Sequence, residues 1–219
     1  MNTFAELTIV LIILLNMAMS VSGSLASCIR LAAAQGVAAG LLPLMAAGGA
    51  HGRAVAFAAF IIALKGLVFP WLMLRARELT GARKEIDPLI GYPASITLCL
   101  AAFAASAWLG SRLPLPEGGV AYIVPASLAT IFTGFLLITT RVKAITQVVG
   151  YLVVENGVYI FGLALFVEQP LMVEMAILLD VFVAVFVMGI AIFHISREFD
   201  HIDTDALSQL SDWRRGEEG

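Results

Sequence analysis

Residues Ala144–Val167 read AITQVVGYLVVENGVYIFGLALFV, an apolar run interrupted by a single charge, that of Glu155. At 1.5 Å of rise per residue, about 20 apolar residues in a helix cross a hydrocarbon core of about 30 Å. Outward from this run, the chain holds six more apolar runs separated by polar connections. The predicted spans are Leu7–Val21, Leu25–Ala47, Ala54–Ala76, Ile90–Leu109, Ala121–Thr140, Ala144–Val167 and Leu171–Ile195. We therefore predict an all-α integral membrane protein of about seven transmembrane helices.

The composition of the whole chain favours the same class. Of its 219 residues, 60% are hydrophobic and only 13% are charged, and the mean hydropathy is +0.95. A soluble domain is usually about 45–50% apolar. The net charge of −3 argues against a nucleic-acid partner. The first six residues carry no positive charge, so we do not predict a cleaved signal peptide.

The arginines and lysines of the connections predict the orientation. Ten of them follow the first, third and fifth spans or lie in the polar tail: Arg30, Arg75, Arg77, Arg83, Lys84, Arg141, Lys143, Arg197, Arg214 and Arg215. The opposite set contains only Arg53 and Arg112. The positive-inside rule then predicts an outside N-terminus and a cytoplasmic C-terminus, in the cytoplasmic (inner) membrane of a prokaryote. We divide the chain into an N-terminal four-helix part (1–112), a three-helix part (121–195) and a cytoplasmic polar tail (196–219).

The chain offers few ligands for a metal or redox cofactor. Cys28 and Cys99 are too few for an iron–sulfur cluster, which needs four thiolates, and neither has a zinc-ligand spacing. His51, His194 and His201 lie in loops or at helix ends, so no pair of histidines flanks a haem in mid-membrane. We predict that this chain holds no cofactor and is not catalytic alone.

Three ionisable residues interrupt the spans at depth: Lys65, Glu155 and Asp180. A charge at the bilayer centre costs about 2.5–3.5 kcal/mol on insertion scales, so such residues usually face protein or water and have a function. Glu155 and Asp180 lie at similar distances from the turn between the last two spans, and Lys65 is the central residue of its span. We predict that the three share one level and relay protons. The alternative is a structural ion pair between Lys65 and Asp180.

A polar stripe surrounds Glu155 on its predicted helix. It consists of Gln147, Tyr151, Glu155 and Tyr159, which are spaced four apart and share one face. Two phenols and an amide can hydrogen-bond a carboxyl group in either protonation state, so we predict that they support the relay. The alternative is that the stripe is polar glue between helices. Next to it, Asn156, Gly157 and Gly162 would let another helix approach closely.

Two further signals concern Lys65 and the cytoplasmic exit. Pro70 should free the carbonyl group of Gly66 and break the helix close to Lys65. The alternative for Lys65 is that its side chain snorkels toward the interface. His194 lies 14 residues beyond Asp180, close to the same face, and is predicted to pass protons inward unless it is an ordinary interfacial histidine.

The run Gln147–Gly157, QVVGYLVVENG, followed by Val173-Glu174 and by Ala176–Asp180, resembles component E of hydrogenase-4. The last three predicted helices are similar to the small K subunit of respiratory complex I, in which two adjacent helices each carry a mid-membrane glutamate of the proton path. Glu155 matches the first of these glutamates. Asp180 stands where the second would be and is one carbon shorter. The resemblance covers Ala121 to about Asp212, and before that it rests on Lys65 with Pro70 and on the helix count.

The resemblance implies a membrane-arm subunit of an energy-converting hydrogenase or a related redox complex. Its expected partners are antiporter-like and other membrane-arm subunits, a peripheral redox arm and the lipid bilayer. Iron–sulfur clusters, and a nickel–iron centre where the parent complex retains one, are expected on those partner subunits. Two alternatives stay open: a stand-alone ion or solute transporter, and a structural anchor subunit.

Overall fold

The computed structural model describes residues 3–46, 52–79, 90–113, 122–141 and 144–165, together with Phe182 and Gly189. Its helices are α1 (Thr3–Val21), α2 (Leu25–Ala46), α3 (Gly52–Ala63), the π-helical turn η1 (Leu64–Val68), α4 (Phe69–Leu79), α5 (Tyr92–Gly110), α6 (Ile123–Thr140) and α7 (Ala144–Leu165). Within the described ranges, six helical segments are long and apolar enough to cross a membrane, with α3, η1 and α4 forming one of them. This all-α chain is a multi-pass membrane protein.

The bounds of the first six predicted spans agree with these helices to within a few residues. The seventh predicted span, Leu171–Ile195, lies outside the described residues, and so do Asp180, His194 and the polar tail. The predictions that rest on them stay predictions.

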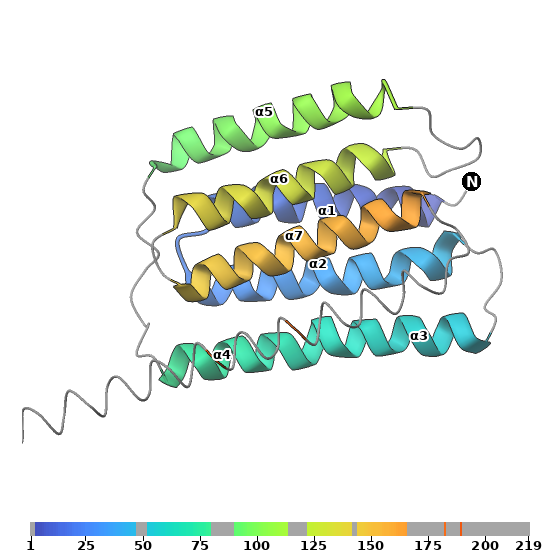
Figure 1. The fold of residues 1–219 in the computed structure, drawn as a ribbon, viewed down its shortest axis with the longest axis horizontal. Helices are drawn as coiled ribbons and strands as arrows, with labels where there is room; N and C mark the ends of the chain where they lie inside the picture. The colour runs from blue at the N-terminus through green and yellow to red at the C-terminus, as the bar shows by residue number, and fades with distance from the viewer. Residues whose placement is uncertain are drawn as a thin grey trace, which may run out of the picture.

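Four helices form the middle of the bundle, because α2 and α6 each contact both α1 and α7 (Figure 1). Helix α5 packs on α6 and α1 at one edge, while α3, η1 and α4 pack on α2 at the other edge. The described helices of the predicted four-helix and three-helix parts therefore pack against each other. Two groups of buried side chains, around Val149 and around Ile160, join them.

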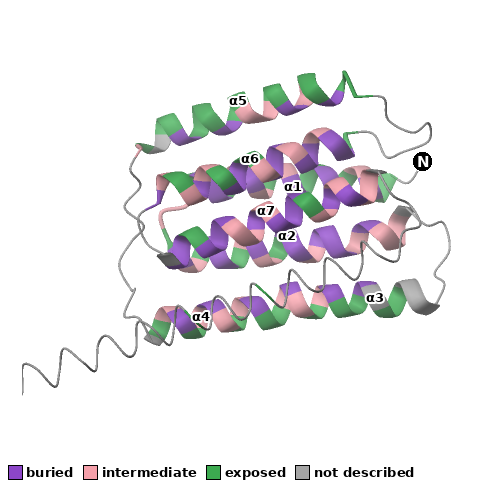
Figure 2. Cartoon of the chain, viewed as in Figure 1, coloured by how far each residue is buried: buried purple, intermediate pink, exposed green. Residues whose placement is uncertain are grey.

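Exposure follows the arrangement expected in lipid (Figure 2). Large apolar side chains such as Phe4, Leu67, Trp71 and Phe135 are exposed on the outside of the bundle, and α5 is exposed along most of its length. In water, apolar patches of this extent would favour aggregation. Buried polar residues lie inside the bundle instead, including Asn16, Gln35, Lys65, Thr130 and Glu155. The polarity pattern of this fold is thus that of a membrane protein with a polar interior.

Glycines allow α6 and α7 to pack backbone to backbone. A Cβ atom added at Gly134 would lie 2.6 Å from the backbone nitrogen of Val154, and one at Gly157 would lie 2.8 Å from that of Ile131. Real Cβ atoms essentially never approach backbone this closely. The predicted close approach at Gly157 is therefore confirmed, and the approaching helix is α6.

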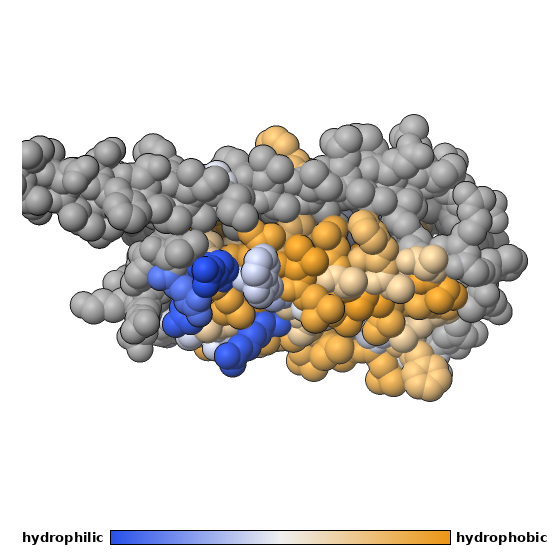
Figure 3. Space-filling view, turned by 90° about the horizontal axis from the view of Figure 1, so that it is seen from below, coloured by the Kyte–Doolittle hydropathy of each residue, from blue (hydrophilic) through white to orange (hydrophobic). Residues whose placement is uncertain are grey.

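Both ends of the bundle carry arginines, but in unequal numbers. Arg30, Arg75, Arg77 and Arg141 lie toward the end where α1, α4 and α6 finish and α2, α5 and α7 begin, whereas Arg53 and Arg112 lie toward the opposite end. We call the first, which has four of the six arginines in the described ranges, the arginine-bearing end. Figure 3 shows polar side chains gathered there on the face formed by α3 and α4, next to a continuous apolar surface.

Candidate functional site: a buried ion pair in the bundle

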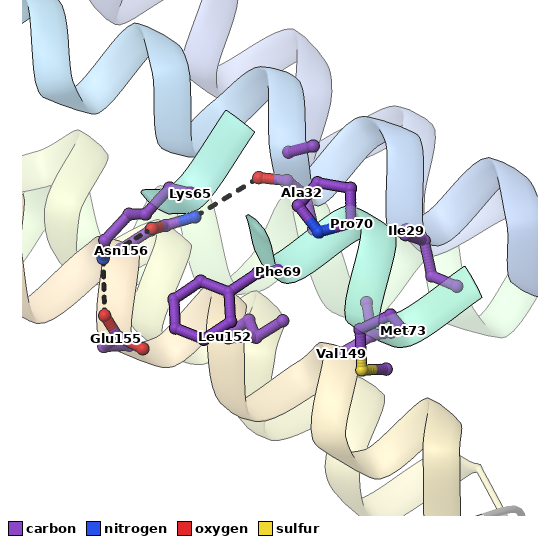
Figure 4. Close-up of a pocket in the computed structure, with 11 residues that line it drawn as sticks. Ile29, Ala32, Lys65, Phe69, Pro70, Met73, Val149, Leu152, Glu155 and Asn156 are labelled. Carbon is purple, nitrogen blue, oxygen red and sulfur yellow. Dashed lines mark hydrogen bonds and ion pairs between the residues drawn. The ribbon is translucent and has the colours of Figure 1, made fainter. Parts of the chain in front are cut away.

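The ammonium group of Lys65 and the carboxylate of Glu155 form an ion pair in the interior of the bundle (Figure 4). Lys65 Nζ lies 2.5 Å from Glu155 Oε1, and the two side chains are 5% and 3% exposed. Removing one partner of such a buried pair typically costs about 3–5 kcal/mol, because the other charge stays behind without compensation. Lys65 does not snorkel; its side chain points into the protein. Lys65 and Glu155 therefore lie side by side in the bundle, and the carboxylate that pairs with Lys65 in the described structure is Glu155.

The π-helical turn η1 carries Lys65 to this position. In η1 the backbone N–H of Phe69 donates to the carbonyl oxygen of Leu64, five residues back, instead of four. A helix break was predicted here from Pro70, and the structure has it as this wider turn just before the proline. Single π-turns inside α-helices are often found at functional sites. Lys65 remains on the buried stripe of its helix, between Ile61 and Phe69.

A glycine on α2 makes room for the lysine stem. A Cβ atom at Gly36 would lie 2.8 Å from Lys65 Cβ, and a Cβ atom at Gly66 would lie 2.7 Å from Val37 Cγ2. Helix α2 and the turn η1 therefore cross closely at the level of the ion pair. The ring of Tyr159 flanks the pair on the α7 side, with its centroid 5.5 Å from Lys65 Nζ, which is a cation–π distance.

A chain of side-chain hydrogen bonds leads from the ion pair across the bundle to α6. Lys65 Nζ donates to Asn156 Oδ1 (3.1 Å), and Asn156 Nδ2 donates to Gln35 Oε1 (3.4 Å) and toward the carbonyl oxygen of Ala32 (3.5 Å). Gln35 Nε2 donates to Asn16 Oδ1 (2.7 Å), and Asn16 Nδ2 donates to Thr130 Oγ1 (2.8 Å). We call Asn156, Gln35, Asn16 and Thr130 the amide chain.

Every link of the amide chain donates in the same direction, away from Lys65. The last link, Thr130 Oγ1, donates to the carbonyl oxygen of Ala126 on its own helix. Hydrogen bonds in such a series polarise one another, so the ammonium group and the chain stabilise each other's orientation. The amide chain therefore ties the charge on α7 and η1 to α2, α1 and α6.

The polar stripe on α7 is only partly assembled around Glu155. Tyr159 is half-buried beside Lys65, as described above. Tyr151 is half-buried and lies within electrostatic reach of Glu155. Gln147 is exposed, and its side chain donates to the carbonyl oxygen of Arg141 (3.1 Å), near the start of α7. The structure thus brings together Lys65, Glu155 and Tyr159, and it places Gln147 at the helix end.

Asn16, Gln35 and Thr130 were not among the residues predicted to have a role. Polar amides near the middle of otherwise apolar spans were the available signal: Gln35 is the eleventh of the 22 residues of α2. Arg141 was also read only as a loop cation, but it is 2% exposed and its Nη2 lies 3.5 Å from the carbonyl oxygen of Ser22. Nothing in the spacing of these residues predicts which neighbour each would meet, because Asn16, Gln35 and Thr130 lie on three different helices and Arg141 directly follows α6.

The chain is similar in sequence to a mycobacterial protein. It is 34% identical over 190 residues to the uncharacterized protein Rv0085 of Mycobacterium tuberculosis, and the match covers 84% of this chain and 85% of that protein. No protein-family model and no solved structure matches the chain.

Proposed function

The chain belongs to the same family as that mycobacterial protein, and from this premise we propose that it is a non-catalytic, proton-translocating subunit of a hydrogenase-related redox complex. In this proposal Lys65 and Glu155 carry the proton inside the bundle, with Asp180 and His194 continuing the path on sequence grounds. The complex itself, with its antiporter-like subunits and its peripheral arm bearing iron–sulfur clusters, is taken from the resemblance to hydrogenase-4 component E. The membrane would be the prokaryotic cytoplasmic membrane.

The single observation that carries the proposal is the ion pair of Lys65 and Glu155, buried among apolar helices. A buried ion pair is weak evidence for stability, because a well-packed apolar pair of similar volume often does as well or better. Residues that only hold membrane helices together are usually small or uncharged and polar. A carboxylate and an ammonium at this depth are better explained by a group that takes up and releases a charge.

The geometry favours a proton over a sodium ion as the cargo at Glu155. A sodium ion needs several oxygen ligands, and at Glu155 the ammonium group of Lys65 already occupies one side of the carboxylate at 2.5 Å. A proton needs only one carboxylate oxygen, so the present arrangement supports proton transfer without displacing Lys65.

The test is Glu155→Gln in the assembled complex. Glutamine keeps the volume and the hydrogen bonding of Glu155 but cannot carry the proton. We expect the variant to be less stable but still to assemble, because the glutamine oxygen can still accept a hydrogen bond from Lys65 Nζ. Electron transfer from an artificial donor should be retained, and redox-driven acidification of sealed vesicles should fall by about 100-fold, the low end of what a positioned acid–base group contributes.

The matched control is Glu78→Gln, which makes the same change on the exposed part of α4. Glu78 is 68% exposed, and its ion pair with Arg75 is 3.9 Å long. This variant should acidify vesicles like the parent. If Glu155→Gln also acidifies vesicles at the parental rate, Glu155 is structural and the proposed function loses its main support.

A further inference from the structure

A small cavity adjoins the ion pair between α2, η1, α4 and α7 (Figure 4). At one end it is lined by Lys65, Glu155 and Asn156, and its other lining residues within the described ranges are apolar. Its volume is about 20 Å³. A single water molecule needs about 10–15 Å³ on this measure and two to four polar partners, and the three polar residues supply those partners.

The cavity extends from the ion pair in one direction. Phe69 and Leu152 line its middle, and Ile29, Met73 and Val149 line the end away from the charges (Figure 4). Ile29 and Val149 lie one to two turns from the first residues of α2 and α7, and Met73 lies between the ion pair and the last residue of α4. These three helix ends all belong to the arginine-bearing end. The cavity therefore points from Glu155 toward that end of the bundle.

The amide chain offers no equivalent route on the other side. Side-chain amides donate and accept hydrogen bonds, but they do not ionise as carboxylates and amines do. A proton that reached Thr130 would have to cross three amide groups with no titratable group among them. The amide chain can hold Asn156 and Lys65 in place, whereas a water molecule can bring a proton.

We propose that this cavity is a binding site for one water molecule that delivers protons to Glu155 from the arginine-bearing end. This inference rests on the proposed function and adds the route to it. In the delivery step, a hydronium ion transfers one proton to a carboxylate oxygen of Glu155, which becomes a neutral acid, and water remains in the cavity. Phe69 and Leu152 separate this site from the outer part of the route.

Thiol labelling tests water access without relying on proton pumping. In the full chain with Cys28→Ser and Cys99→Ser, single Leu152→Cys and Val153→Cys variants are treated in chloride-free buffer with Ag⁺, a membrane-impermeant cation that binds thiolates and is about the size of a water molecule. The two positions are adjacent on α7, but Leu152 lines the cavity and Val153 is fully buried in the apolar core. Because only a hydrated thiolate reacts, we expect labelling at least about tenfold faster for Leu152→Cys, from the arginine-bearing side of sealed vesicles. Equal rates, or faster labelling from the opposite side, would overturn the proposal.

A filling variant tests whether access runs through this cavity. Ala33 lines it, whereas the next residue, Ala34, is exposed and does not. Added to Leu152→Cys, Ala33→Leu should slow labelling by about tenfold by excluding water, while Ala34→Leu should leave the rate unchanged. Similar rates in both double variants would show that the reagent reaches Leu152→Cys by another path, and the proposal would be wrong.

The outcomes also separate this inference from the proposed function. If Glu155→Gln pumps normally while Leu152→Cys is still labelled selectively, the water site stands and the relay fails. If Leu152→Cys is labelled no faster than Val153→Cys while Glu155→Gln abolishes pumping, the relay stands and its proton arrives by another route.

Discussion

At the scale of single residues, the central question is whether Lys65 and Glu155 are there for stability or for charge transfer. The two roles make opposite demands on the pair. A structural pair can be replaced by two apolar residues that fill the same space, since both desolvation penalties then disappear together. A relay cannot be replaced in this way, because its function is the ionisation itself. Single and double substitutions therefore give different patterns for the two roles.

Lys65→Ala should lower both stability and proton coupling. It leaves the buried carboxylate of Glu155, 3% exposed, without its cation, at a cost of about 3–5 kcal/mol unless the acid takes up a proton. We expect assembly to be largely intact, because a protonated Glu155 avoids most of that cost. The measurement is unfolding of the purified chain in detergent, alongside vesicle acidification by the complex. Parental coupling in a fully assembled Lys65→Ala complex would exclude Lys65 from the relay.

The paired change Lys65→Met with Glu155→Leu provides the comparison. Because both charges of the pair are removed together, the double variant should recover most of the stability that Lys65→Ala loses. Proton coupling should remain lost, since both titratable side chains of the ion pair are gone. Recovery of both stability and coupling would assign the pair to the structural anchor role.

Gln35 gives a test of the amide chain. Gln35 is fully buried and accepts from Asn156 while donating to Asn16. Gln35→Leu leaves a buried acceptor on Asn16 and a buried donor on Asn156, so unfolding in detergent should cost about 1–3 kcal/mol less than in the parent.

The control for Gln35→Leu is Thr97→Val. Thr97 is exposed, and its hydroxyl donates to the carbonyl oxygen of Pro93 on the same helix. Its replacement should change the free energy of unfolding by no more than about 0.5 kcal/mol. Equal effects of the two substitutions would mean that the amide chain contributes nothing beyond ordinary surface polarity.

At the scale of the helices, the sequence predicted most of what the structure describes. Six apolar runs located six spans, because length and hydropathy are set along the chain and need no knowledge of neighbours. The common level of Lys65 and Glu155 followed from the same counting. The partner relations did not follow: counting along single helices could not tell that Gln35 of α2 meets Asn156 of α7, nor that Gln147 would remain outside the bundle. These partner relations depend on how each helix is rotated about its own axis. The faces of an apolar helix differ little in polarity, so the sequence leaves that rotation undetermined.

The close packing of α6 on α7 depends on glycine at particular positions. A Cβ atom at Gly134 would lie 2.6 Å from Val154 N and 2.7 Å from the carbonyl oxygen of Gly150, and backbone atoms of a helix cannot move aside. Gly134→Ala should therefore separate the two helices and destabilise the protein by about 1–3 kcal/mol in detergent unfolding. Gly91→Ala is the control, because its nearest neighbour, Pro93 Cδ, lies 3.7 Å away and its φ of −60° suits alanine. Similar unfolding of both variants would refute the close contact.

At the scale of the whole molecule, the number of crossings decides on which side the chain ends. The six described spans form an even number, so Leu165 at the end of α7 lies at the same end of the bundle as Thr3 at the start of α1 (Figure 1). A seventh crossing at Leu171–Ile195 would bring the C-terminus to the arginine-bearing end. The positive-inside rule assigns that end to the cytoplasm. Orientation and helix number therefore need two reporters, one on each side of the predicted last span.

We expect a reporter inserted at Gly118, in the connection from α5 to α6, to be external, and a reporter fused after Gly219 to be cytoplasmic. The first position depends only on orientation, because it follows the fourth described span, whereas the second depends on orientation and on the seventh crossing. If both reporters are external, the orientation is right but Leu171–Ile195 does not cross, and Asp180 could not share a level with Glu155. If the reporter at Gly118 is cytoplasmic, the orientation is reversed, and the cavity beside Glu155 would open to the outside. In that case Glu155 would release protons to the outside through the cavity by which we expect it to take them up from the cytoplasm.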